Sequence, residues 1–205
     1  MTAAIPAASD DDLLPRIQSG DEEAFVVLYR RRQAAIYRFA MHMSGSAAVA
    51  EDVVQEVFLT LLRGGSGYDQ ERGTLSAYLF GIARKLVLRQ LDRGRADVSL
   101  EANGEEAGWP ELAVHDDPLA GLTHRERIQS LRRAVQALPQ RYREVVVLCD
   151  LEEVDYADAA AILACPIGTV RSRLHRARAL LLGKLQQERR FRPAPGTWTA
   201  ARCTT

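Results

Sequence analysis

Apolar residues recur every three or four positions through most of the chain, and this period is typical of amphipathic α-helices. In the first half the pattern predicts four helices: from Ser9 to a stop at Gly20, from Asp21 to the break at residues 44–46, from Ala47 to Arg63, and from Leu75 to Arg93. Ser9 and Asp21 are residue types that cap helix N-termini. A loop with four glycines separates the third helix from the fourth.

The second half repeats the helical pattern after a stretch without periodicity. It predicts helices from Arg125 to Leu138, from Pro139 through Cys149, from a cap at Asp155, and from Pro166 onward. Strand-like alternation is absent from the sequence, so we expect an all-α fold of two small helical domains joined by an acidic flexible linker. The expected boundaries are a disordered N-terminus at 1–9, a first domain at 10–95, the linker at 96–124, a second domain at 125–188 and a tail at 189–205.

The distribution of charge changes this picture, although the formal net charge is zero. Residues 96–124 contain seven acidic residues and no Lys or Arg, whereas residues 125–192 contain 14 basic and eight acidic residues. A basic block of this kind indicates a polyanionic partner. The acidic linker is either a solvated spacer or a shield for a basic face, and the sequence leaves both readings open.

Several function classes are not expected from this composition. The sequence has no apolar run of about 18 residues and begins with an acidic segment, so we expect a cytoplasmic protein without membrane insertion. The three cysteines have no metal-ligand spacing. Cys149 and Cys165 are expected to be small buried apolar groups. Since no phosphate-binding or catalytic motif is present, we expect no cofactor, no metal and no enzymatic activity.

The last two predicted helices form a helix-turn-helix pattern, in which a short alanine-rich helix precedes a tight turn and a basic helix. Val170, Leu174, Ala177 and Leu181 give the basic helix an apolar stripe. Arginine can grip a guanine edge or neutralise a phosphate, so the opposite face is a candidate DNA-binding surface. The alternative is an amphipathic helix with a merely solvated charged face. The candidate residues are Thr169, Arg171, Ser172, Arg173, His175, Arg176 and Arg178.

A second basic surface is predicted on the helix that begins at Leu75. Three cations recur there at a spacing of four residues, and two tyrosines lie nearby. Aromatic rings among cations favour stacking on unpaired bases, although a tyrosine in the core and a solvated row of cations would give the same pattern. The candidate residues for single-stranded DNA are Tyr68, Arg72, Tyr78, Arg84, Lys85, Arg89 and Arg93.

Four segments together resemble a known family. They are AEDVVQEVFLTLLR, GTLSAYLFGIARKLVLRQLDR, LPQRYREVVVLCDLEEVDYADAAAIL and CPIGTVRSRLHRARALL. In this order they are similar to bacterial RNA polymerase sigma factors of the extracytoplasmic-function (ECF) group of the sigma-70 family. The resemblance covers about residues 10–188 and identifies the two predicted domains with sigma regions 2 and 4.

The resemblance implies a set of partners and roles. Region 2 would dock on the clamp helices of the largest subunit of core RNA polymerase through Asp52, Gln55 and Glu56. It would bind the unpaired −10 promoter element, with a flipped base in the loop 64–74, while region 4 would place the helix from Pro166 in the major groove of the −35 element. The flap of the second-largest polymerase subunit and an anti-sigma factor are further partners that it implies.

Two positions depart from the family pattern, and other functions stay open at this stage. Many relatives have Trp where this chain has Tyr78 and Asn where it has Lys85, so a −10 base preference cannot be transferred. The main alternative is a stand-alone helix-turn-helix repressor or activator that binds DNA as a dimer. A polymerase-binding regulator without promoter recognition is a further alternative.

Overall fold

The computed structural model describes residues 8–63, 68–97 and 118–191, and within these ranges every regular element is helical. The prediction of an all-α fold is therefore confirmed. The elements are α1 (Asp10–Gln18), α2 (Glu22–Ser44), α3 (Ala47–Leu62), a 3-10 turn η2 (Gln70–Arg72), α4 (Leu75–Asp97), α5 (Pro118–Gln136), α6 (Gln140–Val146), a π-turn η3 (Val147–Leu151), α7 (Tyr156–Leu163) and α8 (Ile167–Phe191).

Local sequence signals determine most of the helix ends. Ser9 and Asp12 form a capping box on α1, and the Asp21 side chain accepts a hydrogen bond from the backbone of Ala24 at the start of α2. At the end of α2, Gly45 adopts a left-handed conformation with φ 76°, which glycine adopts without strain. These caps confirm the predicted starts of the first two helices and the break after the second.

Other boundaries differ from the prediction. Helix α5 begins at Pro118 rather than Arg125, because proline is favoured in the first turn of a helix. The last residues of the predicted linker are therefore helical. Helix α4 continues to Asp97, and α8 extends through Phe191 into the predicted tail. Asp155 precedes α7 as expected, but its side chain makes no capping hydrogen bond. Residues 1–7, 64–67, 98–117 and 192–205 lie outside the described residues. The first four residues of the loop 64–74, which was predicted to hold a flipped base, are among them.

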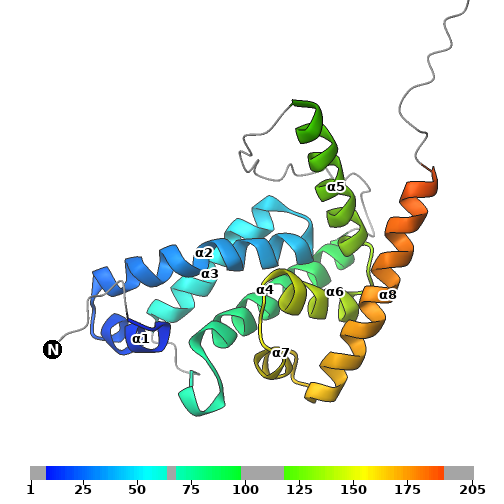
Figure 1. Cartoon of the computed structure of the whole chain (residues 1–205). Helices are drawn as coiled ribbons and strands as arrows, with labels where there is room; N and C mark the ends of the chain where they lie inside the picture. The colour runs from blue at the N-terminus through cyan, green and yellow to red at the C-terminus, as the bar shows by residue number, and fades with distance from the viewer. Residues whose placement is uncertain (1–7, 64–67, 98–117, 192–205) are drawn as a thin grey trace, which may run out of the picture.

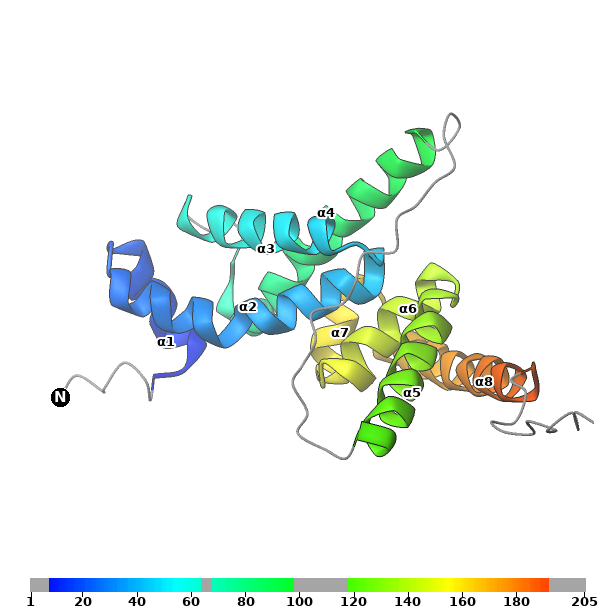
Figure 2. The same cartoon turned by 90° about the horizontal axis from the view of Figure 1, so that it is seen from above.

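Helices α1 to α4 form one small bundle, in which α2 and α3 lie side by side and α4 crosses them (Figures 1 and 2). Its core contains the fully buried side chains of Leu28, Ile36 and Phe39 from α2 and Val57 and Leu61 from α3. The Phe39 and Phe80 rings pack edge to face with centroids 5.6 Å apart, which links α2 to α4.

Helices α5 to α8 form the second bundle, and the two bundles pack against each other. Arg84 on α4 donates to the Glu144 carboxylate on α6 at 3.1 Å, and Arg38 on α2 donates to Glu152 at 2.7 Å. Thr74 donates its hydroxyl proton to Asp158 on α7 at 2.8 Å. The sequence predicted two helical pieces, and the structure adds an interface between them, in which these polar contacts accompany buried apolar residues of both bundles that form one continuous cluster.

Candidate nucleic-acid interface

The turn between α7 and α8 sets the direction of the basic helix. Ala164 ends α7 in a left-handed conformation with φ 49°, and the Cys165 amide donates back to the Ala160 carbonyl at 3.0 Å. The Pro166 carbonyl then accepts from the Thr169 amide at 2.8 Å. This tight turn is followed by a fully buried stripe of Val170, Leu174 and Ala177, so the other face of α8 is directed to solvent.

The seven residues predicted to contact DNA on α8 do not lie in equivalent environments. Arg171, Ser172, His175 and Arg176 are exposed, as predicted, whereas Thr169 and Arg173 are half-buried. The Arg173 guanidinium lies 4.0 Å from the Cys165 sulfur. Arg171, Ser172, His175 and Arg176 therefore offer two guanidiniums, a hydroxyl and an imidazole to solvent.

Arg178, the last of the seven, is already paired within the chain. It donates from Nη2 to Oδ1 of Asp150 at 2.5 Å and from Nε to Oδ2 at 3.0 Å. This bidentate hydrogen bond and the charge of Asp150 raise the pKa of Arg178 above its usual range. A phosphate would have to compete with Asp150 for this guanidinium. The pairing of Arg178 with Asp150 was not predicted from the sequence.

On α4 the predicted cations divide into two groups. Lys85, Arg89 and Arg93 are exposed and, with Leu88 and Asp92, line a shallow depression on the surface of the helix. Arg84 instead points to the second bundle and donates from both Nε and Nη2 to the Glu144 carboxylate. The Arg72 side chain lies outside the described residues.

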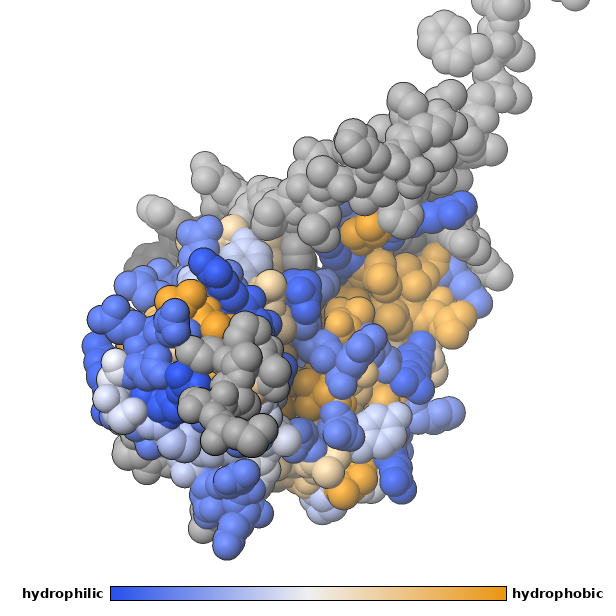
Figure 3. Space-filling model, turned by 60° about the vertical axis from the view of Figure 1, so that its left-hand side comes forward, coloured by the Kyte–Doolittle hydropathy of each residue, from blue (hydrophilic) through white to orange (hydrophobic). Residues whose placement is uncertain are grey.

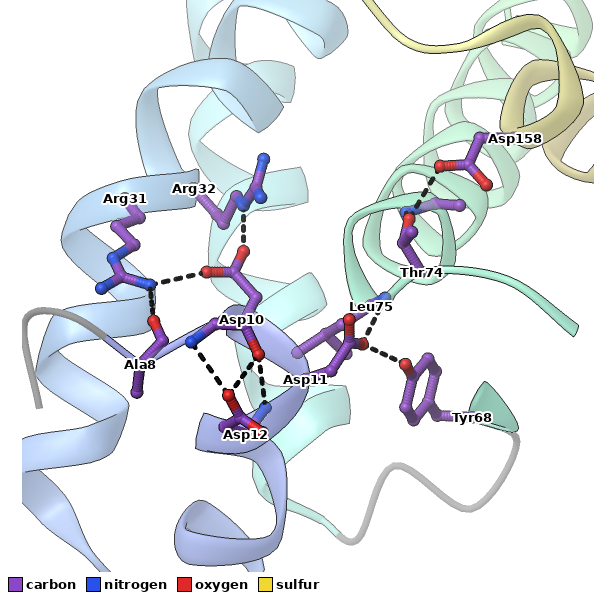
Figure 4. Close-up of polar contacts among 12 residues, drawn as sticks. Ala8, Asp10, Asp11, Asp12, Arg31, Arg32, Tyr68, Thr74, Leu75 and Asp158 are labelled. Atoms are coloured by element: carbon purple, nitrogen blue, oxygen red, sulfur yellow. Dashed lines mark hydrogen bonds and ion pairs between the residues drawn. The ribbon is translucent and has the colours of Figure 1, made fainter. Parts of the chain in front are cut away.

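The two tyrosines predicted to stack on bases lie together. Their ring centroids are 5.6 Å apart with planes tilted by 58°, and both side chains are half-buried. The Tyr68 hydroxyl donates to the Asp11 carboxylate of α1 (Figure 4). Burial, reinforced by this hydrogen bond, raises the pKa of Tyr68. Sequence analysis missed Asp11 because an acidic residue in the first turn of a helix needs no further explanation.

The predicted polymerase-binding residues lie on the outer face of α3. Asp52 and Gln55 are exposed, whereas Glu56 is half-buried and lies 3.4 Å from Arg63. Beside them a groove of about 900 Å³ runs between α2 and α3, with Phe25, Tyr29 and Phe58 in its lining. No local sequence pattern predicts this groove, because its lining combines side chains of α2 and α3 with Arg132 of α5.

Apolar side chains gather on one exposed face of the molecule, where hydrophilic residues surround them (Figure 3). Leu62, at the end of α3, is 51% exposed. Leu62 also lines the groove between α2 and α3. Apolar surface rimmed by polar residues is typical of a protein-binding site.

None of the described helices has the length and apolar character that crossing a bilayer requires.

Comparison with known families identifies both bundles. Residues 28–96 match the model for sigma-70 region 2, and residues 128–181 match the model for sigma-70, region 4. The two matches have the order expected for a sigma factor. A stand-alone helix-turn-helix regulator is therefore not favoured.

Individual relatives agree with these matches. The ECF RNA polymerase sigma factor SigE of Mycolicibacterium smegmatis is 34% identical over 181 residues, which are 88% of this chain and 65% of that protein. The ECF RNA polymerase sigma-E factor of Escherichia coli is 34% identical over 186 residues, or 87% of this chain and 95% of that protein. The sigma factor RpoE of Bartonella quintana, solved with the anti-sigma factor NepR, has a similar structure with a TM-score of 0.61 and 28% identity, covering 75% of this chain and 91% of that one.

Proposed function

The chain belongs to the ECF group of RNA polymerase sigma factors, and on this basis we propose how its surfaces share the work of promoter recognition. The proposal rests on the exposed polar face of α8, which lies on the side of the helix opposite its buried stripe. In this arrangement α8 reads the −35 element, the tyrosine pair and the cations of α4 bind the −10 strand, and α3 docks on core polymerase. The polymerase performs the chemistry of transcription in the cytoplasm, and this chain supplies sequence recognition.

Region 4 reads the −35 element through the first turns of α8. A recognition helix places its N-terminal residues against base edges in the major groove and its later residues nearer the phosphates. Arg171 and Ser172 lie at the N-terminal end and are exposed, so they are the candidates for base contacts. His175 and Arg176 follow one turn later and are the candidates for contacts with the groove wall and backbone.

Region 2 binds the unpaired −10 strand along α4. Exposed Lys85, Arg89 and Arg93 recur at every turn of this helix and so form a row that can follow a phosphate backbone. The Tyr68 and Tyr78 rings lie near its start and supply a stacking surface. This surface binds bases only after the duplex has opened, so strand capture depends on polymerase.

Core polymerase docks on the outer face of α3. Asp52 and Gln55 are exposed there and suit a basic partner, and the adjoining apolar groove adds buried area to the contact. The same groove suits an amphipathic helix of an anti-sigma factor, which would then compete with polymerase. The flap of the second-largest polymerase subunit is a further contact for region 4.

Promoter binding requires the two bundles to separate. Arg84 belongs to the proposed −10 surface and Thr74 ends the loop predicted to hold a flipped base, yet both donate hydrogen bonds to carboxylates of the second bundle. The carboxylates accept the hydrogen bonds that phosphate oxygens would otherwise accept from these two side chains. Binding of core polymerase must therefore release α6 and α7 from α4.

Run-off transcription tests the proposal. Core polymerase with and without the protein is incubated with a library of genomic promoters, and the transcripts are sequenced. We expect transcripts from a defined promoter set only when the protein is present, and loss of these transcripts with Arg171→Ala plus Arg176→Ala. Lys184→Ala, which changes a cation farther along α8, is the matched control. Absence of protein-dependent transcripts, together with tight binding of a dimer to duplex DNA, would favour a repressor.

A further inference from the structure

One carboxylate of α1 connects three parts of the first bundle. Asp11 Oδ1 accepts a hydrogen bond from the Leu75 backbone amide at 3.0 Å and another from the Tyr68 hydroxyl (Figure 4). Leu75 is the first residue of α4, and Tyr68 follows the glycine-rich loop. The same oxygen therefore fixes both ends of the segment 68–75.

Helix α1 is itself firmly anchored, so Asp11 has a fixed position. The side chains of Leu13, Leu14 and Ile17 are buried in the core of the first bundle. The neighbouring Asp10 binds Arg31 of α2 at 3.0 Å and also accepts from Arg32 (Figure 4). Movement of Asp11 would require these apolar and ionic contacts to break.

The start of α4 has one support from each bundle. Thr74 Oγ1 accepts from the Ala77 amide at 3.1 Å and donates to Asp158 of α7 at 2.8 Å. This second contact is lost when the bundles separate. The Asp11 contacts lie entirely within the first bundle, and so they persist in the form that binds the promoter.

The position of Tyr68 depends on the same carboxylate. Its ring lies beside the Tyr78 ring at 5.6 Å, and its hydroxyl proton is committed to Asp11. A ring held at its hydroxyl end loses rotational freedom before a base arrives. Preorganisation of this kind lowers the entropy cost of binding.

We propose that Asp11 is a positioning residue for promoter opening, which holds Tyr68 and the first turn of α4 so that an unpaired base can stack on the tyrosine pair. This role rests on the proposed function. It extends that function to α1, which lies outside the segments 28–96 and 128–181 that match the family models.

The test compares three variants in the holoenzyme. Asp11→Ala removes both hydrogen bonds, and Asp11→Asn keeps an acceptor oxygen without the charge. Asp12→Ala is the matched control, because it removes only the hydrogen bonds that the Asp12 carboxylate accepts from Ser9. The probe is a promoter from the run-off experiment with 2-aminopurine in its −10 element, and its fluorescence reports opening. We expect Asp11→Ala to reduce opening about tenfold, Asp11→Asn to be intermediate, and Asp12→Ala to match the wild type.

A double mutant separates positioning from general stability. If Asp11 acts through Tyr68, Asp11→Ala costs much less opening in a Tyr68→Phe background than in the wild type. Binding to core polymerase and to a duplex carrying only the −35 element should be unchanged in every variant. An equal loss of opening in Asp11→Ala and Asp12→Ala, or full additivity with Tyr68→Phe, overturns the role of Asp11.

Hydrogen exchange in the isolated full chain provides a readout that needs no promoter. Asp11→Ala should accelerate exchange of the Leu75 amide, whereas Asp12→Ala should not. Unchanged exchange at Leu75 overturns the inference even if opening is reduced. A wild-type holoenzyme that opens no promoter overturns the proposed function together with this role, whereas wild-type opening with a fully active Asp11→Ala variant overturns only the role of Asp11.

Discussion

The Arg84 guanidinium on α4 lies against the Glu144 carboxylate on α6, with Nη2 3.1 Å from Oε2, and so joins the two bundles of the molecule. The Glu144 side chain is only 3% exposed, and its other oxygen accepts from Gln140 at 3.3 Å. A carboxylate buried to this extent needs its cation, because an unpaired buried charge is costly. The pair therefore stabilises the packed arrangement of the bundles. It also keeps Arg84, a cation proposed to bind DNA, bonded to a carboxylate.

Removal of Arg84 should destabilise the free protein more than neutralisation of Glu144. Arg84→Ala leaves the Glu144 charge buried without its ion pair, and we expect a loss of about 3 kcal/mol in the free energy of unfolding. Glu144→Gln leaves a more exposed arginine and should cost less. Urea denaturation measures both values, with exposed Arg89→Ala as the control on the same helix. Equal effects of all three variants would contradict the importance of the pair.

Arg171 is expected to read a base edge. Arg171→Ala should cost about 1–3 kcal/mol in holoenzyme binding and flatten the preference at one −35 position. The measurement is holoenzyme binding to every single-base variant of the −35 element. A uniform loss across all variants would assign base reading to another residue, with Ser172 and His175 as the next candidates.

Asp150 should limit the affinity of α8 for DNA. Asp150→Asn removes the charge that holds Arg178, so the guanidinium becomes available for a phosphate. We expect stronger binding to all sequences and a salt dependence steeper by about one unit in log–log slope. Arg178→Ala should abolish this gain. Binding titrations at three or more salt concentrations measure the slope, and an unchanged slope in Asp150→Asn would show that Arg178 does not reach the DNA.

The outer face of α3 should determine affinity for core polymerase. Asp52→Arg reverses an exposed charge that we expect to meet a basic partner, and binding to core should weaken about tenfold or more. Glu56→Arg should add a smaller effect, since Glu56 is near Arg63. Glu22→Arg changes an equally exposed acid at the start of α2 and is the control. Titration of labelled core polymerase gives the affinities, and equal affinities for Asp52→Arg and Glu22→Arg would contradict the assignment.

His42 should make the fold less stable in acid. Burial, followed by the charges of Arg132 and Arg38, lowers the pKa of His42 from 6.5 to about 4. Between these pH values the unfolded chain binds a proton that the folded chain does not. The free energy of unfolding is therefore unaffected by this group above pH 6.5 and falls by up to about 3 kcal/mol as the pH approaches 4. His42→Asn should flatten this slope in denaturation curves measured at several pH values.

Glu152 changes the pH dependence of stability in the opposite direction, so its contribution must be separated from that of His42. Its side chain is 1% exposed, and burial raises its pKa, although Arg38 partly offsets this shift. The folded chain therefore binds this proton more readily than the unfolded chain. As a result, the free energy of unfolding increases as the pH falls through the raised pKa of Glu152. The difference between wild type and His42→Asn at each pH cancels this contribution. A difference that does not vary between pH 7 and pH 4 would contradict the assignment to His42.

Local chemistry explains which features the sequence could predict. The Ser9 and Asp21 caps, the break at Gly45 and the buried stripe of α8 depend on residues within one or two turns of each other, so their spacing is sufficient evidence. The exposure of Arg171 and Asp52 follows from the same periodicity. Their roles in binding DNA and polymerase stay predictions.

Contacts between distant segments could not be predicted in this way. Arg84 and Glu144 are 60 positions apart, and Tyr68 and Asp11 are 57 apart. Helical periodicity shows which face of a helix is apolar but not which partner a polar side chain meets. For this reason Arg84 and Arg178 were predicted only as DNA-binding cations, and their carboxylate partners were missed.

The buried side chains of α1 determine how region 2 can be isolated. A fragment trimmed to residues 28–96, the segment that matches the family model, would lack Leu13, Leu14 and Ile17 and would expose the apolar surface that they cover. It would also lose the first six residues of α2 and the carboxylate at the start of α4. The smallest unit that keeps this core closed therefore begins at Ser9, 19 residues before the family match.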